Sequence, residues 1–198
     1  MATDIETVLQ NLLASYDFAD KTLIAIGGGG GQIAGYGSLV RRAIAIDSDA
    51  AAIAQLAERV AELGLADKFE LVTGDFFTQR RQGDVALFEF CLHEMADPGE
   101  ALARAREMAP EVVVFDHYPG SPWAFQVAEE EKVARCWEAI RAQSPRLVQT
   151  FGGLQRFAQY DELLAKVSSQ GEVAVERARP FAAARDITIR MSYAVVVL

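Results

Sequence analysis

The chain of 198 residues is 51% hydrophobic and 24% charged, which is enough for one domain with a sizeable core but not for two. Its net charge of −9 argues against nucleic acid as the main partner, because binding to phosphates requires a basic face. The 2 cysteines lack metal-site or disulfide spacing, and no apolar run reaches the roughly 18 residues of a membrane span. We therefore expect residues 1–198 to form a single soluble, cytoplasmic domain, a monomer or homodimer, that binds a small molecule and no membrane.

Residues 1–20 are predicted to contain an amphipathic helix. Its apolar positions recur at helical spacing: Ile5, Val8, Leu9, Leu12 and Leu13. Such a helix could pack on the rest of the domain or close over a ligand as a lid. Packing is the favoured role, because lids are a minority use of terminal helices.

Five consecutive glycines, residues 27–31, lie between two short apolar runs at residues 23–26 and 43–46. We expect both runs to be strands and the segment between them to turn and continue as a helix, as in a βαβ unit. Glycine suits such a turn because it permits positive φ and, having no Cβ, lets the backbone lie directly against a ligand. Asp47, at the end of the second run, could then accept hydrogen bonds from a ribose diol. A flexible linker is disfavoured, because linkers are polar and are not enclosed by apolar strands.

The remaining elements follow from hydrophobic periodicity. Helices are predicted at residues 48–64, 98–108, 123–142 and 160–168, and strands at residues 69–73, 84–90, 111–115, 172–178 and 187–197. Residues 147–153 give no clear prediction, and the charge run at residues 129–132 predicts solvated surface. The alternation indicates an α/β fold: a doubly wound, mainly parallel sheet of seven strands, with helices on both faces and an antiparallel carboxyl-terminal hairpin.

Polar and aromatic residues follow several of these strands. Asp75 and Phe76 come after the third strand, where an acid and a flat ring could bind the amino group and face of a purine. His93 follows the fourth strand and His117 the fifth, so both histidines are expected at the edge where open α/β sheets bind ligands. The alternative is that each histidine merely caps or packs a loop.

In this order, the signals resemble those of class I S-adenosylmethionine-dependent methyltransferases, over nearly the whole chain. The glycine and acid positions of that family fall on Gly27, Gly29, Gly31, Asp47 and Asp75. The segment LHEMAD after the fourth strand is similar to the family's motif at that place, and the final SYAVVVL also fits. Ala25 stands where the family usually carries an acid, so the methionine amine must be recognised by another group.

The resemblance implies S-adenosylmethionine as cofactor and a small-molecule methyl acceptor. The implied cofactor-binding residues are Gly27, Gly29, Gly31, Asp47, Ser48, Asp75, Phe76 and Phe90. Methyl transfer is an in-line displacement, so the protein aligns the acceptor and removes a proton where the acceptor carries one. The acceptor is expected among Glu89, His93, Glu94, Asp116, His117, Tyr118 and Trp123.

His93 is the first candidate for the group that accepts a proton from the acceptor or orients it, and His117 is the second, with Asp116 beside them. No metal site is predicted. The minority alternative is a divalent ion held by oxygen and nitrogen ligands from Asp116, His117, His93 and Glu89.

Two other functions fit part of the pattern. Gly29, Gly31 and Ala34 satisfy G-x-G-x-x-A, as in an NAD-dependent oxidoreductase, although the chain has no room for a separate substrate domain. A non-catalytic nucleoside-binding or sensor protein of the same fold is the second alternative, because a fold does not establish catalysis. A Walker-type phosphate loop is excluded, since no Lys-Ser or Lys-Thr follows the glycines.

Overall fold

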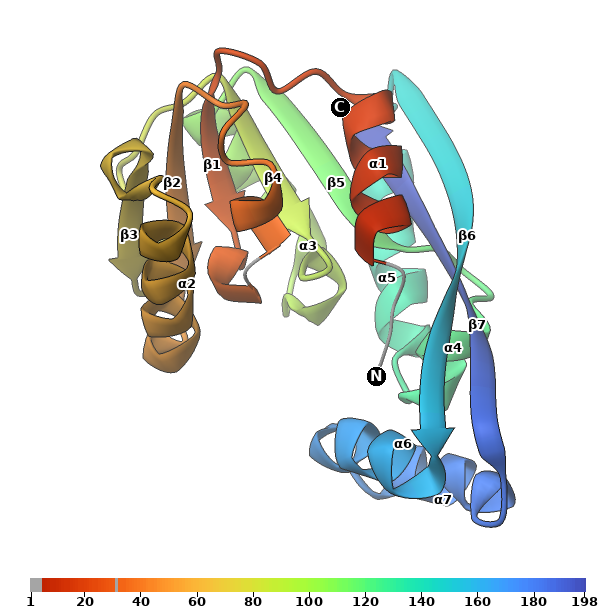
Figure 1. The fold of residues 1–198 in the computed structure, drawn as a ribbon. Coiled ribbons are helices and arrows are strands. Elements are labelled where there is room, and N and C mark those ends of the chain that lie inside the picture. The colour runs from red at the N-terminus through yellow and green to blue at the C-terminus, as the bar shows by residue number, and fades with distance from the viewer. Residues whose placement is uncertain (1–4, 31) are drawn as a thin grey trace.

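A computed structural model describes residues 5–30 and 32–198, and within them seven strands form one sheet between two layers of helices (Figure 1). The strands are β1 (Thr22–Ile26), β2 (Arg42–Asp47), β3 (Phe69–Thr73), β4 (Val85–Glu89), β5 (Glu111–His117), β6 (Leu147–Gln159) and β7 (Arg185–Val197). The α-helices are α1 (Ile5–Ser15), α2 (Ala50–Glu62), α3 (Pro98–Met108), α4 (Pro122–Gln126), α5 (Glu130–Ala142), α6 (Tyr160–Val167) and α7 (Glu172–Ala178). No helix among the described residues combines the length and apolarity needed to cross a membrane.

The strand order is β3-β2-β1-β4-β5-β7-β6. Strands β1 to β5 are parallel, whereas β7 runs antiparallel to both of its neighbours, β5 and β6. The predicted class is therefore confirmed: a doubly wound, mainly parallel sheet with an antiparallel carboxyl-terminal hairpin. Since the carboxyl ends of parallel strands share one edge, the residues that follow β1, β2, β4 and β5 are brought together there.

The central strands are apolar on both faces because helices cover both sides of the sheet. In β1, Leu23 and Ala25 pack in the layer that contains α1 and α2. Ile24 and Ile26 alternate with them and pack in the layer that contains α3 and α5. This alternation explains why the strands read as continuous apolar runs in the sequence.

The segment after the glycine run is not the predicted α-helix. Its described residues form two short 3-10 helices, η1 (Gly28–Gly30) and η2 (Gln32–Gly35). Glycine is costly in a helix interior, and Gly35 and Gly37 recur soon after the run. A Cβ on Gly37 would lie 2.6 Å from the ring of Phe69, so this segment needs glycine for close packing against β3.

The predicted helix at residues 123–142 is two helices, α4 and α5. The chain breaks between them at Ala128, which adopts a left-handed φ of 60° that an α-helix cannot contain. The charge run that follows is only partly solvated, contrary to the prediction. Glu129 is buried, Glu130 pairs with Arg177, and Lys132 pairs with Glu94.

The carboxyl-terminal region also differs from the prediction. Residues 172–178 form α7 instead of a strand, because Ala174 and Ala178, four residues apart, are both fully buried. The alternation of Val173 and Val175 imitates a strand pattern. The hairpin is instead made by β7 and β6, and α6 and α7 lie at its far end (Figure 1).

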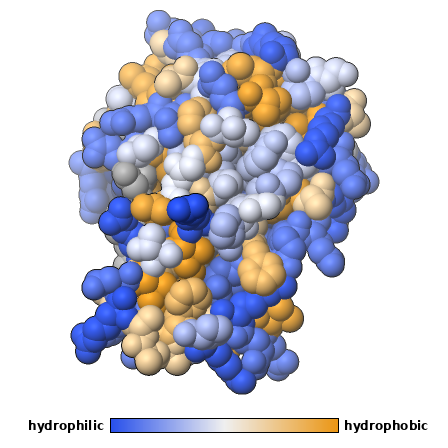
Figure 2. All heavy atoms as spheres, turned by 90° about the vertical axis from the view of Figure 1, so that its right-hand side faces the viewer, coloured by the Kyte–Doolittle hydropathy of each residue, from blue (hydrophilic) through white to orange (hydrophobic). Residues whose placement is uncertain are grey.

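Residues 147–153, which gave no prediction, begin β6 at the edge of the sheet. Most of their side chains are exposed or half-buried, so the period-2 signal of a buried strand is missing. Figure 2 faces this side and shows mainly hydrophilic side chains, with hydrophobic ones gathered towards the end where α6 and α7 lie.

A cluster of polar side chains lies at the amino-terminal end of β5, opposite the end of the sheet that carries the candidate site. Glu111, at the start of β5, accepts hydrogen bonds from the Tyr16 hydroxyl and from Arg146, and Lys21 Nζ lies 2.9 Å from it. The hydrogen bond from Tyr16, with those from Lys21 and Arg146, outweighs burial and lowers the pKa of Glu111 from 4.5 to about 2. The cluster joins the segment after α1 to the starts of β5 and β6.

Replacing Glu111 with Gln should lower the free energy of unfolding at pH 7 by about 1–2 kcal/mol, measured by urea denaturation. The folded pKa lies below the ordinary value, so the stabilisation is complete above pH 4.5 and is lost as the pH falls towards 2. The difference between wild type and Glu111→Gln should therefore shrink below pH 4.5. Glu58→Gln, on the exposed face of α2, is the control. An equal loss in both variants, or no pH dependence, would contradict this assignment.

Candidate active site

A cavity of about 480 Å³ lies at the carboxyl ends of β1, β2 and β3. Among the predicted cofactor-binding residues, those that line it are Gly27, Asp47, Ser48, Asp75 and Phe76. Gly31, which was predicted with them, lies outside the described residues. Because these side chains come from three separate loops, only the parallel arrangement of the strands brings them together.

The glycine turn and Asp47 hold each other in place. The amide of Gly29 donates to Asp47 Oδ2 at 2.9 Å, and the amide of Asp49 donates to Oδ1 at 2.9 Å. A Cβ on Gly29 would lie 2.5 Å from Ala52 Cβ and 2.7 Å from Asp47 Oδ2, so only glycine permits this approach. Each carboxylate oxygen keeps a further lone pair, which leaves Asp47 able to bind hydroxyl groups in the cavity.

The opposite wall of this cavity is aromatic. Phe76 is buried, and its ring meets that of Phe88 edge to face at a centroid distance of 5.9 Å. Asp75, immediately before it, is exposed and accepts a hydrogen bond from the amide of Phe77 at 2.9 Å. An exposed carboxylate beside apolar rings suits a flat group that carries hydrogen-bond donors.

A second cavity of about 630 Å³ lies beneath α1. Its lining includes Ile5, Val8, Leu9, Gly30, Phe90, His117, Trp123, Gln155, Lys166 and Met191. Val8 is buried and also lines the cavity, so α1 packs on the domain and at the same time roofs this space. Phe90, predicted as a cofactor residue, lies here beside His117, with ring centroids 5.1 Å apart. Gln155 and Met191 had no functional prediction, because they belong to the carboxyl-terminal hairpin, whose first strand the sequence did not reveal.

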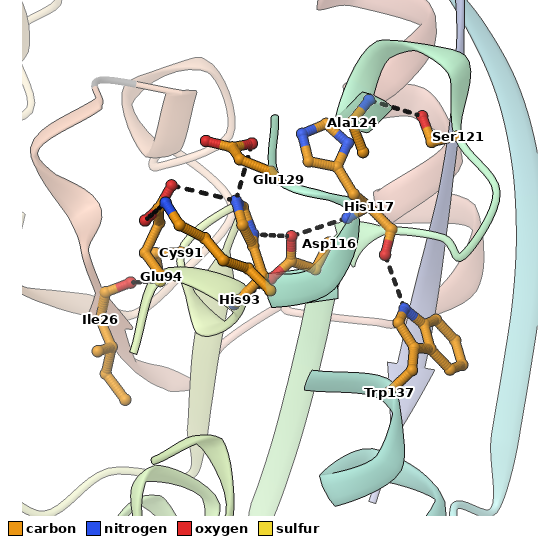
Figure 3. Close-up of polar contacts among 11 residues, drawn as sticks. Ile26, Cys91, His93, Glu94, Asp116, His117, Ser121, Ala124, Glu129 and Trp137 are labelled. Carbon is orange, nitrogen blue, oxygen red and sulfur yellow. Dashed lines mark hydrogen bonds and ion pairs between the residues drawn. The ribbon is translucent and has the colours of Figure 1, made fainter. Parts of the chain in front are cut away.

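Asp116, the penultimate residue of β5, fixes both histidines. Its carboxylate accepts from His93 Nδ1 at 2.6 Å and from the backbone amides of His93 and His117 at 3.1 Å and 2.7 Å (Figure 3). Asp116 is only 1% exposed, so these bonds are shielded from water. When the His93 ring is neutral, this geometry places its proton on Nδ1 and leaves Nε2 as an acceptor.

The other nitrogen of His93 faces two acids. Nε2 lies 3.4 Å from Glu129 Oε2 and 3.5 Å from Glu94 Oε1 (Figure 3). Burial lowers the pKa of His93, but the hydrogen bond with Asp116 and the nearby carboxylates of Glu129 and Glu94 outweigh it and raise that pKa to about 11. Without another cation, His93 is therefore protonated at neutral pH and cannot accept a proton.

The pKa of His117 is shifted in the opposite direction. Burial lowers its pKa to about 4, so the ring is neutral at pH 7. Its Nδ1 is buried and, among the described residues, has no hydrogen-bond partner. Since His117 lines the second cavity and is neutral, its position and protonation state favour it as a candidate proton acceptor, whereas the sequence analysis placed His93 first.

Glu129 is a site residue that the sequence analysis missed. It is 5% exposed and lies with the two histidines, with one ligand atom from each residue within 4.8 Å of the others. A signal for it does exist in the sequence. Glu129 precedes Val133 by four residues, and Val133 begins the buried stripe of α5, so helical spacing places this acid on the apolar face.

Glu89, the last residue of β4, is a third buried acid at this end of the sheet. The Tyr36 hydroxyl donates to its Oε2 at 3.4 Å, whereas Oε1 has no partner within the described part of the chain. Burial raises the pKa of Glu89 to about 8. In the register of β1 and β4, Ala25 pairs with Leu87, and strand alternation places Glu89 on the same face as Leu87. An acid from β4 thus lies close to the position where the resembled family carries one on β1.

No family model and no curated protein matches the sequence. Many solved structures match the fold. A candidate methyltransferase from Bacillus halodurans has a TM-score of 0.68 at 12% identity, over 98% of this chain and 97% of the other. A SAM-dependent methyltransferase from Thiobacillus denitrificans, solved with S-adenosyl-L-homocysteine, has a TM-score of 0.62 at 11% identity, over 97% and 90% of the two chains.

The mitomycin 7-O-methyltransferase MmcR is a further neighbour, with a TM-score of 0.58 at 22% identity. Its match covers 73% of this chain and 49% of the other, so the likeness is confined to the shared domain. The strand order, the position of the glycine turn and these neighbours lead to the same conclusion. The chain has the fold of class I S-adenosylmethionine-dependent methyltransferases.

Proposed function

We propose that the protein transfers a methyl group from S-adenosylmethionine to a small-molecule acceptor. The observation that carries this proposal is that consecutive residues of the loop after β4 line the two cavities: Cys91 lines the first cavity and Phe90 the second. A nucleoside in the first cavity would hold its sulfonium group at the entrance to the second, near His117. The neighbour solved with S-adenosyl-L-homocysteine supports the same choice of cofactor.

The cofactor would lie with its adenine between Asp75 and Phe76 and with its ribose hydroxyls on Asp47 and Ser48. These four residues line one cavity, and the carboxylate of Asp47 is held ready by the amide of Gly29. The methionine part would then pass over the glycine turn towards Phe90. A charge-assisted hydrogen bond to the ribose would be among the stronger contacts in such a complex.

Glu89 would recognise the methionine ammonium group, a role for which the sequence offers no acid on β1. Its Oε1 is buried without a partner among the described residues, and a hydrogen-bond donor from a ligand would stabilise a buried carboxylate oxygen of this kind. A bound ammonium would also favour the ionised form of Glu89, against the effect of burial. Tyr36 would hold the other oxygen in place.

Two variants separate these contacts by calorimetry with two ligands. Asp47→Asn should weaken S-adenosylhomocysteine and methylthioadenosine alike, by about 1–3 kcal/mol, because both ligands carry the ribose. Glu89→Gln should weaken S-adenosylhomocysteine by a similar amount and leave methylthioadenosine unchanged, because the latter lacks the amino acid part. Unchanged affinities in Asp47→Asn, or equal losses for both ligands in Glu89→Gln, would remove the respective assignment.

The acceptor would lie in the second cavity, beneath α1. Its lining combines aromatic and aliphatic side chains with polar ones, His117 among them, as small-molecule sites do. The neighbour named as a mitomycin 7-O-methyltransferase supports an acceptor of this size. As the methyl carbon bonds to the acceptor, the carbon–sulfur bond breaks and sulfur keeps the electron pair. A hydroxyl or thiol acceptor must also lose its proton.

We assign the handling of that proton to His117, the last residue of β5. His117 faces the cavity, and Asp116 positions His93 and the backbone of His117. In this assignment His117 contacts the acceptor, and Asp116 acts through the two residues that it holds.

Incubation with methyl-labelled cofactor and fractionated pools of small molecules should yield a labelled product. With the acceptor identified, His117→Asn should lower turnover at saturating cofactor by about 10²–10⁴-fold, the usual contribution of a proton-transfer group. Its affinity for S-adenosylhomocysteine should stay that of the wild type. Wild-type turnover in His117→Asn would contradict its role. Binding of the cofactor without any labelled product would favour a non-catalytic nucleoside-binding protein.

A further inference from the structure

We propose that His93, His117 and Glu129 bind a divalent transition-metal ion, such as Zn²⁺, at the inner end of the acceptor cavity. All three side chains are buried, and one ligand atom from each lies within 4.8 Å of the others. They come from three separate segments: the loop after β4, the end of β5 and the residue before α5. The role of the ion in methyl transfer depends on the function proposed above, but its binding does not.

The distances around His93 Nε2 are those of a coordination sphere. Donor atoms bound to one ion at about 2.0–2.2 Å in a tetrahedral site lie about 3.3–3.6 Å from each other. His93 Nε2 lies 3.4 Å from Glu129 Oε2 and 3.5 Å from Glu94 Oε1. Both distances exceed the 2.7–2.9 Å or so of a normal charge-assisted hydrogen bond. A rotation of His117 that brings its ring nitrogen closer by about 1 Å would complete three protein ligands of such a site.

The negative charges around His93 also favour a bound cation. Three carboxylates, those of Asp116, Glu129 and Glu94, surround the single imidazole of His93. Lys132 is paired with the outer oxygen of Glu94, 2.6 Å away, and does not neutralise the buried acids. One proton on Nε2 cannot form good hydrogen bonds to two carboxylates at once. An ion in its place would contact the nitrogen and Glu129 together, and the charge of Glu94 would lie nearby.

Two further features of the histidines are typical of metal ligands. His93 donates its Nδ1 proton to Asp116 when neutral, and a carboxylate in this position orients ligating histidines and raises their basicity. His117 Nδ1 is buried and has no partner among the described residues, which is costly unless a ligand satisfies it. Figure 3 shows the rings of His93 and His117 on either side of the Glu129 side chain.

Two imidazoles and one carboxylate favour a transition metal over Mg²⁺, which prefers an octahedron of oxygen ligands. Three protein ligands leave a position open, as in catalytic zinc sites. An acceptor hydroxyl or thiol in that position would lose its proton to water more readily, because the ion stabilises the anion. Its oxygen or sulfur would then take the methyl group. With the ion bound, loss of the proton to water would replace direct transfer to His117, and both histidines would act through the ion.

The test uses the full chain after treatment with a chelator. Zn²⁺ should bind in calorimetry with one ion per chain, Co²⁺ should give the visible absorption bands of a four- or five-coordinate site, and excess Mg²⁺ should displace neither. His117→Ala and Glu129→Gln should each weaken Co²⁺ binding at least tenfold. Glu131→Gln, which changes an exposed acid two residues from Glu129, is the matched control and should bind as the wild type does.

Asp116→Asn provides a variant that keeps all three ligands and should weaken binding by about 10–100-fold through its effect on His93. Circular dichroism establishes that each variant is folded. A chelator-treated wild type that takes up neither Zn²⁺ nor Co²⁺ would overturn the inference, as would equal affinity in the ligand variants. Methyl transfer without metal binding would remove this inference alone. Metal binding without methyl transfer would support it and contradict the proposed function instead.

Discussion

The contact between the Gly29 amide and Asp47 Oδ2, 2.9 Å apart, is the constraint on which the candidate site depends. It holds the turn after β1 against the end of β2, and no side chain larger than that of glycine fits between Asp47 and Ala52. Gly27, with a φ of +68°, completes the turn beside Cys91. The first cavity lies over this turn, and the second begins at Gly30. The backbone of residues 27–30 therefore separates the two cavities.

Beyond that turn, the site concentrates buried ionisable groups. Asp116, Glu129, His93 and Glu89 are each at most 9% exposed, and a buried ionic group destabilises a fold unless its partners are well placed. Asp116 is compensated by three hydrogen bonds, whereas Glu89 and His117 each keep one atom without a partner in the described chain. Uncompensated groups at one edge of a sheet are typical of binding sites, where a ligand supplies the missing contacts. The cluster around Glu111, at the other edge, has all its charges paired and serves stability.

Much of the fold could be predicted because apolar runs and their order are local properties of the sequence. The strands from β1 to β5 and the helices α2, α3 and α6 are confirmed near the predicted boundaries. The elements that were predicted wrongly or missed also have local causes. Alternating valines imitate a strand in α7, and the exposed edge strand β6 lacks a buried face. The glycines that make the turn also prevent the α-helix predicted after it.

The candidate site was predictable only in part. Chain order places His93 and His117 at the same edge, but the bond from His93 to Asp116 depends on the register of β4 with β5 and on the loop between them. The protonation states depend on burial and on partners distant in the chain, which the sequence does not contain, so the preference for His117 as a candidate proton acceptor comes from the structure. Glu129 was assigned to the surface because it opens a run of acids, although its helical spacing from Val133 indicates the buried face.

A crystal structure with S-adenosylhomocysteine tests the central claim most directly. The proposed binding mode predicts adenine beside Phe76, ribose hydroxyls on Asp47, and sulfur near Phe90 and Cys91, directed towards His117. A nucleoside bound in the cavity beneath α1, or a sulfur directed away from the two histidines, would contradict it.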